Sequence, residues 1–184
     1  MSNWTFIETE RKFLVHSNYI DFEMPANGKK QTIHQGYICE NPKMRFRYTE
    51  EDNTVMLAMK ESFAPGKSTE IEFKLASNFG LDCFNIIKKR ILINTIIIEK
   101  TRYRIPYEYP KRTGWFKRDK LFWEIDVYSK ENNGLFVAEI ELPQIDYPLY
   151  LPPWIIREVT GESRYSNFNL AHKPFRSWTE EERG

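Results

Sequence analysis

Charged residues occupy every second position in several segments of this chain, and neighbours on one face often carry the same sign. The segment IETERKFLV, residues 7–15, is rich in residues that favour strands. Side chains of a strand alternate between its two faces. One face of the expected strand therefore carries Glu8, Glu10 and Lys12. The opposite face carries Ile7, Thr9, Arg11 and Phe13.

Six later segments repeat this alternation. Two like charges on one strand face lie ~7 Å apart and repel by about 2 kcal/mol at an effective dielectric near 20. A solvated face normally mixes signs, because adjacent like charges destabilise a sheet. Five same-sign pairs in one small chain therefore indicate an external ligand that holds them together. The later charged positions are Arg45 and Arg47 of MRFRY, Lys60 of MLAMKES, Glu70, Glu72 and Lys74 of STEIEFKL, Lys100, Arg102 and Arg104 of EKTRYRI, Glu124 and Asp126 of WEIDVY, and Glu139 and Glu141 of VAEIEL.

The two kinds of charged face suit complementary ligands. Pairs of carboxylates suit hard cations, which take oxygen ligands, and arginine and lysine groups suit phosphate oxygens. The wet face of an open antiparallel sheet would explain any single strand, but it does not explain the repeated same-sign pairs. A closed barrel satisfies the whole pattern, because it removes edge strands, encloses the charges and leaves the apolar faces to pack outward.

Length and composition place the chain among single-domain proteins. Its 184 residues are enough for one core and are 41% hydrophobic. We expect one domain over residues 1–184, with a core at about 4–172 and a polar tail at 173–184. Because 27 basic residues face 26 acidic ones, bulk charge predicts neither a nucleic-acid nor a membrane partner.

The N-terminus shows no signal-peptide pattern, and the longest apolar run, ILINTIII at residues 91–98, is too short to span a bilayer. Cys39 and Cys83 have no metal-ligand or disulfide spacing, so we expect two reduced thiols in a cytoplasmic protein. The three histidines share no spacing that would predict a metal site. No glycine-rich phosphate loop is present in the sequence.

The local patterns predict an α+β fold that is mostly β, with about eight antiparallel strands in a closed barrel and helices packed outside. Helical spacing covers residues 77–90, with Ser77 or Asn78 as the N-cap. The β-branched stretch 91–105 reads as one long strand. A hairpin is expected at 121–143, around the turn sequence KENNG. Residues 152–160 read as a short helix opened by proline.

Taken together, these motifs resemble the CYTH superfamily, the triphosphate tunnel metalloenzymes. ETERKFLV matches the E-x-E-x-K signature of that family. It is followed in family order by HQGYI, MRFRY, MK at 59–60, EIE at 70–72, EKTRY at 99–103, WEIDV, VAEIEL and PPWIIREVTGESRY. The resemblance covers about residues 4–172 and is strongest to the short, single-domain bacterial branch, in which inorganic triphosphatases are found.

The resemblance implies an eight-stranded tunnel with a charged lumen, a linear triphosphate as substrate, and a requirement for Mg²⁺ or Mn²⁺. It also implies a role for each inward charge. The expected metal ligands are Glu8, Glu10, Glu139 and Glu141. The expected phosphate-binding residues are Lys12, Arg45, Arg47, Lys60, Lys100 and Arg102. The remaining tunnel acids, which would orient water or bind a second metal in catalysis, are Glu70, Glu72, Glu124 and Asp126.

The chain also departs from the family pattern. Relatives often carry arginines shortly before the EKTRY strand, where this chain has INTIII. Lys88, Lys89 and Arg90 lie nearby and are candidate substitutes. The long basic loop 106–120 either caps a tunnel mouth or forms a solvated hairpin tip.

The function expected from the resemblance is metal-dependent hydrolysis of inorganic tripolyphosphate to phosphate and pyrophosphate. Four alternatives stay open on the sequence alone: a thiamine-triphosphatase, a nucleoside-triphosphatase, a class IV adenylate cyclase, and a non-catalytic module that binds polyphosphate or nucleotides. The expected partner is a small-molecule triphosphate or polyphosphate. The sequence does not define the oligomeric state, so a homodimer also stays open.

Overall fold

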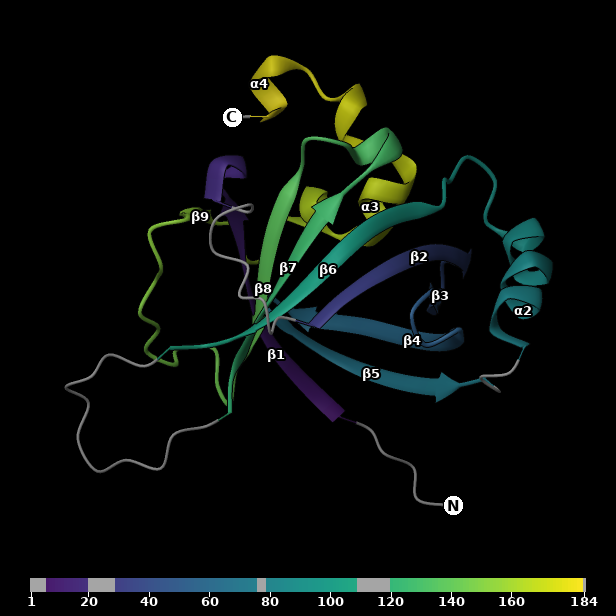
Figure 1. Ribbon diagram of the computed structural model, residues 1–184, viewed down its shortest axis with the longest axis horizontal. Helices are drawn as coiled ribbons and strands as arrows, with labels where there is room; N and C mark the ends of the chain where they lie inside the picture. The colour runs from purple at the N-terminus through teal and green to yellow at the C-terminus, as the bar shows by residue number, and fades with distance from the viewer. Residues whose placement is uncertain (1–5, 20–28, 76–78, 109–119, 184) are drawn as a thin grey trace.

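Strands dominate the computed structural model, which describes residues 6–19, 29–75, 79–108 and 120–183 (Figure 1). The strands are β1 (Phe6–Val15), β2 (Lys29–Cys39), β3 (Lys43–Thr49), β4 (Thr54–Ala64), β5 (Lys67–Lys74), β6 (Ile98–Pro106), β7 (Phe122–Tyr128), β8 (Phe136–Glu141) and β9 (Ile155–Glu158). The α-helices are α2 (Gly80–Ile87), α3 (Asn167–His172) and α4 (Glu180–Arg183). Short 3₁₀ turns are η1 (Ser17–Tyr19), η3 (Lys88–Arg90), η4 (Lys130–Asn132), η5 (Ser163–Tyr165) and η6 (Phe175–Ser177).

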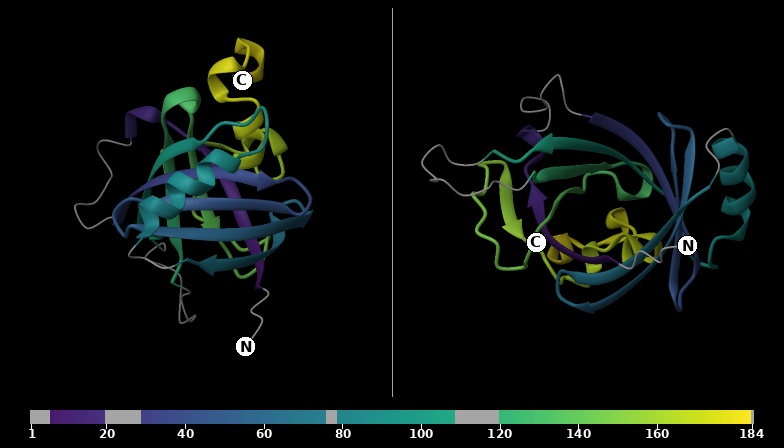
Figure 2. Two further views of the ribbon diagram at one scale, coloured as in Figure 1. Left: turned by 90° about the vertical axis from the view of Figure 1, so that its right-hand side faces the viewer. Right: turned by 90° about the horizontal axis from the view of Figure 1, so that it is seen from below.

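Eight strands close into a barrel in the order β5-β4-β3-β2-β6-β7-β8-β1, and the pairing of β1 with β5 completes the ring. All these pairings are antiparallel. The view from below in Figure 2 shows the ring of strands, with α2 outside it and the C-terminal helices across its far end. The closed eight-stranded barrel predicted from the charge pattern is thus confirmed.

Strand β1 lies at the centre of this closure. On one edge it pairs first with β5 and then, from Phe13 to Val15, with the ninth strand β9. On the other edge it pairs with β8 from Glu10 to Leu14. Between the parts of β1 that pair with β5 and with β9, two hydrogen bonds tie its backbone to neighbouring loops. The Glu10 amide donates to the Gly66 carbonyl at 2.8 Å, and the Lys12 amide donates to the Thr160 hydroxyl at 3.0 Å.

The apolar faces of the strands point outward and are covered. Helix α2 packs against β3 and β4, where the Phe84 ring stacks on Tyr48 with centroids 5.1 Å apart. On the opposite side, Trp123 of β7 meets Phe13 of β1 and Trp154 edge-on, at 5.5 and 5.2 Å between ring centroids. The charged positions of the same strands are therefore left to face the lumen.

One end of the barrel interior is apolar, which the sequence pattern did not predict. Ile98, Tyr128 and Val137 continue the inward faces of β6, β7 and β8 beyond their charged residues, and all three are buried. Phe168 and Leu170 of α3 pack into the same core. The charged lumen therefore occupies only part of the barrel length.

Two of the expected elements are wrong. The long strand expected at 91–105 begins only at Ile98. Before it, the Leu92 amide donates a single hydrogen bond to the Tyr37 carbonyl of β2, the Ile96 amide donates to Ala171 of α3, and Asn94 adopts a positive φ of 63°, so this segment forms no ladder. The helix expected at 152–160 is instead the strand β9. There the unpaired end of β1 offers backbone groups that an extended segment can satisfy and a helix cannot.

The helix expected at 77–90 is present as α2 followed by η3, and both proposed cap residues lie outside the described part of the chain. The remote Asn53 side chain accepts from the Leu81 amide at 3.0 Å and so satisfies the first turn. A Cβ atom at Gly80 would lie 2.0 Å from the Asn53 carbonyl oxygen, so this close approach requires glycine.

The C-terminal segment, expected as a polar tail, forms η6 and α4 in the structure. Trp178 is buried, and its ring lies edge-on to Tyr165 at 5.3 Å between centroids. Across the described ranges, we find no helix with the length and apolar character needed to cross a membrane.

Candidate active site

The inward charges meet around one cavity of about 260 Å³ inside the barrel. Of the fourteen site residues predicted from the sequence, thirteen line this cavity, and the exception is Asp126. Their metal, phosphate or catalytic roles stay predictions, since burial and position do not assign a ligand. The lining consists of Glu8, Glu10, Lys12, Gln35, Tyr37, Lys43, Arg45, Arg47, Lys60, Ser62, Glu70, Glu72, Lys100, Arg102, Glu124, Glu139, Glu141, Ser166, Asn167 and Phe168.

Three carboxylates from β1 and β8 form an acidic group in this lining. Glu10 and Glu141 are direct cross-strand partners, and Glu8 lies two residues before Glu10 on the same face. Directly opposed like charges destabilise a sheet. Lys60 of β4 offsets part of this repulsion, because its ammonium lies 2.8 Å from Glu8 and 3.7 Å from Glu10. One cation, from the second strand beyond β1 around the ring, thus lies beside the group.

Glu141 is the least compensated of the three acids. No cation of the described chain lies within ion-pair distance of its carboxylate. Burial raises the pKa of the Glu141 carboxyl above its ordinary value, and the carboxylate of Glu124 raises this pKa further. Glu8 and Glu10 act in the same direction. A bound cation would remove this unfavourable charge.

The donor set of this group fits a hard divalent cation, because it offers only carboxylate oxygens and carries excess negative charge. In the side-chain positions observed here, no three acidic, histidine or cysteine groups within the described ranges surround a common point as bound metal would require. Lys60 accounts for this arrangement, since its ammonium already occupies the space between Glu8 and Glu10. Metal binding therefore requires these side chains to rearrange.

A second group of charges centres on Arg102 of β6. Its guanidinium binds Glu124, and it also contacts Asp126 at 2.7 Å and Glu139 at 3.2 Å. Lys12 of β1 contacts Glu139 at 2.8 Å. Burial alone would raise the pKa of Glu139, but the charges of Lys12 and Arg102 hold this pKa well below its usual range. Glu139 is therefore a carboxylate with two cationic partners, and its part in metal binding stays a prediction.

Lys100 is a buried base of the site whose pKa is lowered. Its ammonium lies 2.5 Å from Asp126 and is almost completely buried. Burial lowers the pKa of Lys100 to about 8, although the Asp126 charge opposes this shift. Asp126 compensates only in part because it also binds Arg102, whose positive charge lowers the Lys100 pKa further. At neutral pH a measurable fraction of Lys100 is thus an uncharged amine.

A third group lies on β3 and β5. Arg45 binds Glu70 and lies 3.5 Å from Glu72, while Arg47 lies 3.4 Å from the same Glu72. These residues come from strands that are separated by β4, so they face each other across the curved wall. Guanidinium groups held in this way present their remaining N–H donors to the cavity.

Asp126 takes a different position from the other predicted acids. It is completely buried behind Lys100 and Arg102, and it orients both cations by hydrogen bonds of 2.5 to 2.8 Å. Its neighbour Glu124 on the same strand face reaches the cavity. Strand alternation predicted the face of Asp126 but not its depth.

The proposed substitutes Lys88, Lys89 and Arg90 do not reach the lumen, because η3 lies outside the barrel and its three side chains are exposed. That expectation is wrong. Most of the basic loop 106–120, residues 109–119, lies outside the described part of the chain. Lys120, at the end of that loop, lines a second cavity described below.

Several lining residues escaped the sequence reasoning. Lys43 and Ser62 follow the same period-two pattern as Arg45 and Lys60, so the pattern contained the signal for them. Gln35 and Tyr37 are neutral, so the alternation of charged residues contains no signal for them. Their side chains are hydrogen-bonded, with the Gln35 amide donating to the Tyr37 hydroxyl at 2.8 Å. The other lining residues that were missed are Ser166, Asn167 and Phe168, which the fold brings in from a distant segment.

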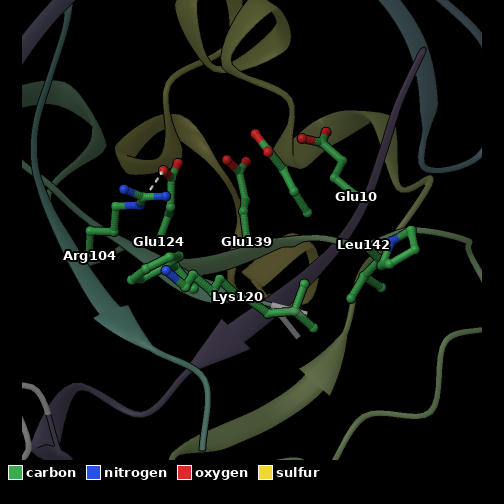
Figure 3. Close-up of a pocket in the computed structure, with 10 residues that line it drawn as sticks. Glu10, Arg104, Lys120, Glu124, Glu139 and Leu142 are labelled. Carbon is green, nitrogen blue, oxygen red and sulfur yellow. Dashed lines mark ion pairs between the residues drawn. The ribbon is translucent and has the colours of Figure 1, made fainter. Parts of the chain in front are cut away.

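A second cavity of about 280 Å³ lies next to the first and shares its acids. Figure 3 shows Glu10, Glu124 and Glu139 side by side in this space, with Arg104 beside Glu124 and Lys120 below them. The Arg104 guanidinium lies over the Phe122 ring at 4.0 Å from its centroid. Along β6 the side chains change from buried Lys100 to half-exposed Arg104. This space is therefore the approach to the charged lumen.

Comparisons with known proteins agree with this geometry. No family model matches the chain. It is 28% identical over 173 residues to a protein of Acetivibrio thermocellus named inorganic triphosphatase, an alignment that covers 94% of this chain and 98% of the relative. The crystal structure of the inorganic triphosphatase NE1496 matches with a TM-score of 0.58 and 25% identity, over 90% of this chain and 94% of the other. The closed barrel, the inward charges and these two similar proteins agree with the resemblance to the CYTH superfamily of triphosphate tunnel proteins.

Proposed function

We propose that this protein hydrolyses inorganic tripolyphosphate to phosphate and pyrophosphate in the charged lumen. The observation that supports this most directly is the coexistence of a carboxylate group on β1 and β8 with seven basic residues around one small cavity. Anion binding alone needs no such carboxylates. Both relatives described above bear the name inorganic triphosphatase.

The cations of the lumen can neutralise the negative charge of a polyphosphate and position it before it reacts. Arg45 and Arg47 reach the cavity from β3, Arg102 from β6 and Lys12 from β1, so the cations converge from different parts of the ring. Their carboxylate partners fix them in place, so little reorganisation is needed when phosphate oxygens arrive. With both ends of a short phosphate chain held in this way, a terminal phosphoryl group is aligned for attack by water.

Glu8, Glu10 and Glu141 are the residues that would hold the divalent cation. Their oxygen-only donor set suits Mg²⁺ or Mn²⁺, and the excess negative charge around Glu141 favours a cation there. When bound, such an ion neutralises charge on phosphate oxygens and stabilises the charge that develops during phosphoryl transfer. The choice between the two metals is part of the proposal.

Lys100 is a candidate general base. Because its pKa is about 8, the amine is mostly protonated at pH 7 and mostly neutral at pH 9. If the neutral amine accepts the proton of the attacking water, kcat/KM should rise roughly tenfold between these pH values. Lys100→Met should abolish that rise. A kcat/KM that falls through pH 8 would instead assign Lys100 to phosphate binding as a cation.

The assay that tests the proposed function offers purified protein tripolyphosphate, thiamine triphosphate and ATP in turn, with Mg²⁺ or Mn²⁺. Phosphate, pyrophosphate and cyclic AMP are measured as products. We expect turnover of tripolyphosphate with equal amounts of phosphate and pyrophosphate, and loss of this turnover with EDTA. Tight binding of tripolyphosphate without turnover would contradict the proposal and indicate a binding module.

The proposal also covers location. Cys39 and Cys83 are both free thiols, as expected for a reducing compartment. We therefore propose a cytoplasmic protein whose partner is a small-molecule triphosphate.

A further inference from the structure

The ammonium of Lys60 contacts three carboxylates at once. It lies 2.8 Å from Glu8, 3.5 Å from Glu70 and 3.7 Å from Glu10. The side chains of Lys60, Glu8 and Glu10 are each about a quarter exposed, at 23, 25 and 26%, so the group faces the cavity and is not sealed in the core. Glu70 is the buried member, with 3% of its side chain exposed.

This position matters because Glu8 and Glu10 are two of the three carboxylates that we assign to the divalent cation. A metal ion and the ammonium cannot both take the same carboxylate oxygens. Two cations at such a short separation also repel strongly in a partly buried site. Metal binding must therefore move Lys60 away from Glu8 and Glu10.

The structure offers a place for the displaced ammonium. Glu70 lies on β5, the strand between Lys60 on β4 and the acids on β1, and it is already anchored by Arg45. Lys60 can keep this contact when it leaves Glu8 and Glu10, because Lys60 and Glu70 are direct cross-strand partners. Its charge then stays within the lumen, where the proposed substrate binds.

We propose that Lys60 is an internal counter-ion that holds the metal-binding carboxylates together without metal and competes with the divalent cation for them. This inference rests on the proposed function, since it takes Glu8 and Glu10 as metal ligands. Removing the ammonium should then have two opposite effects. The metal-free protein loses stability, because its clustered acids lose their cation, and the same protein binds the divalent ion more tightly.

The test compares Lys60→Met with Lys43→Met. Lys43 is the cross-strand partner of Lys60 on β3 and lines the same cavity, but its ammonium lies over the Phe168 ring at 4.9 Å from the centroid. Lys43→Met thus removes the same charge from the same cavity without touching the carboxylates. Mn²⁺ alone is titrated into each protein and followed by electron paramagnetic resonance, and thermal unfolding is measured in EDTA and in saturating Mn²⁺.

For Lys60→Met we expect Mn²⁺ binding about tenfold tighter than in the wild type and a metal-free Tm about 5 °C lower, which Mn²⁺ restores. Lys43→Met should stay within about twofold in affinity and about 2 °C in Tm. Unchanged or weaker Mn²⁺ binding by Lys60→Met would overturn the inference. With intact tripolyphosphate turnover in the wild type, that result would leave the proposed function standing. Tighter Mn²⁺ binding by Lys60→Met, together with no tripolyphosphate turnover in the wild type, would support the inference about Lys60 and contradict the proposed function.

If Lys60→Met does not fold without metal, the wild type provides the test. Crystal structures in EDTA and in Mn²⁺ should differ at Lys60, with its ammonium moved beyond about 4 Å from Glu8 and Glu10 when the ion is bound. An ammonium that stays on both carboxylates beside the bound ion would refute the competition.

Discussion

Glu10→Gln is expected to lower metal-dependent turnover of tripolyphosphate by at least about 100-fold while the barrel stays folded. Glu10 lies opposite Glu141 and next to Glu8, so the substitution removes one charged ligand from the centre of the carboxylate group. Loss of metal-derived charge stabilisation costs several kcal/mol, and each 1.4 kcal/mol is about tenfold in rate. Stability should hold, because removing one of three clustered negative charges relieves repulsion and Lys60 keeps Glu8 and Glu70 as partners.

Steady-state phosphate release and thermal unfolding are the measurements for Glu10→Gln. The matched control is Glu61→Gln, which changes an exposed glutamate next to Lys60 on the outward face of β4. This control should retain wild-type turnover. Full activity of Glu10→Gln would show that the metal assignment is wrong.

Arg102→Met should be the most destabilising single change in the lumen. The guanidinium contacts Glu124, Asp126 and Glu139, and only 12% of its side chain is exposed. Without the guanidinium, three carboxylates of the largely buried lumen lose a positively charged partner. Breaking a buried ion pair by removing one partner costs about 3–5 kcal/mol. For a domain of this size, the Tm should fall by roughly 6–20 °C.

The control for Arg102→Met is Arg104→Met, two residues further along the same face of β6. The Arg104 side chain is 47% exposed, and among the described residues its one ion pair is with Glu124 at 3.7 Å. An exposed pair of this kind contributes about 1 kcal/mol or less. Urea unfolding of both variants gives the comparison. Equal losses at the two positions would contradict the view that the buried network around Arg102 stabilises the barrel.

Strand alternation made the site largely predictable from the sequence. In a closed barrel one face of every strand must point inward, so a charged face opposite an apolar face defines the lining. Glu124 and Glu139 were placed correctly in this way without any knowledge of which strands are neighbours. The resemblance then added roles that alternation alone cannot assign.

The sequence could not predict features that depend on the register between paired strands or on how deep a side chain lies along the barrel. The direct opposition of Glu10 and Glu141 follows from the pairing of β1 with β8, which no local pattern defines. The burial of Asp126 behind two cations depends on where along the barrel the polar lining ends. Lys60 comes near β1 only because β5 pairs with both β4 and β1 and so closes the ring.

The two wrong elements have a tertiary cause. PPWIIREVT carries a helix-start signal in its prolines, but β1 extends beyond β5 and offers an unpaired edge that takes up residues Ile155–Glu158. The β-branched run 91–97 likewise leaves the sheet. Ile91 and Ile97 pack instead beside Phe84 in the core under α2. Local propensity was overruled in both places by burial and hydrogen bonding elsewhere.

Strand β1 carries Glu10 and Lys12 in its middle, where neighbouring segments bind its backbone on both edges. The strand at which the ring closes therefore also carries residues of the candidate active site. Separation of β1 from its neighbours would displace Glu8 and Glu10, the carboxylates proposed to bind the cation, so we expect β1 to stay paired during turnover. Because an apolar core and α3 fill one end of the barrel interior, we expect substrate and products to enter and leave at the other end.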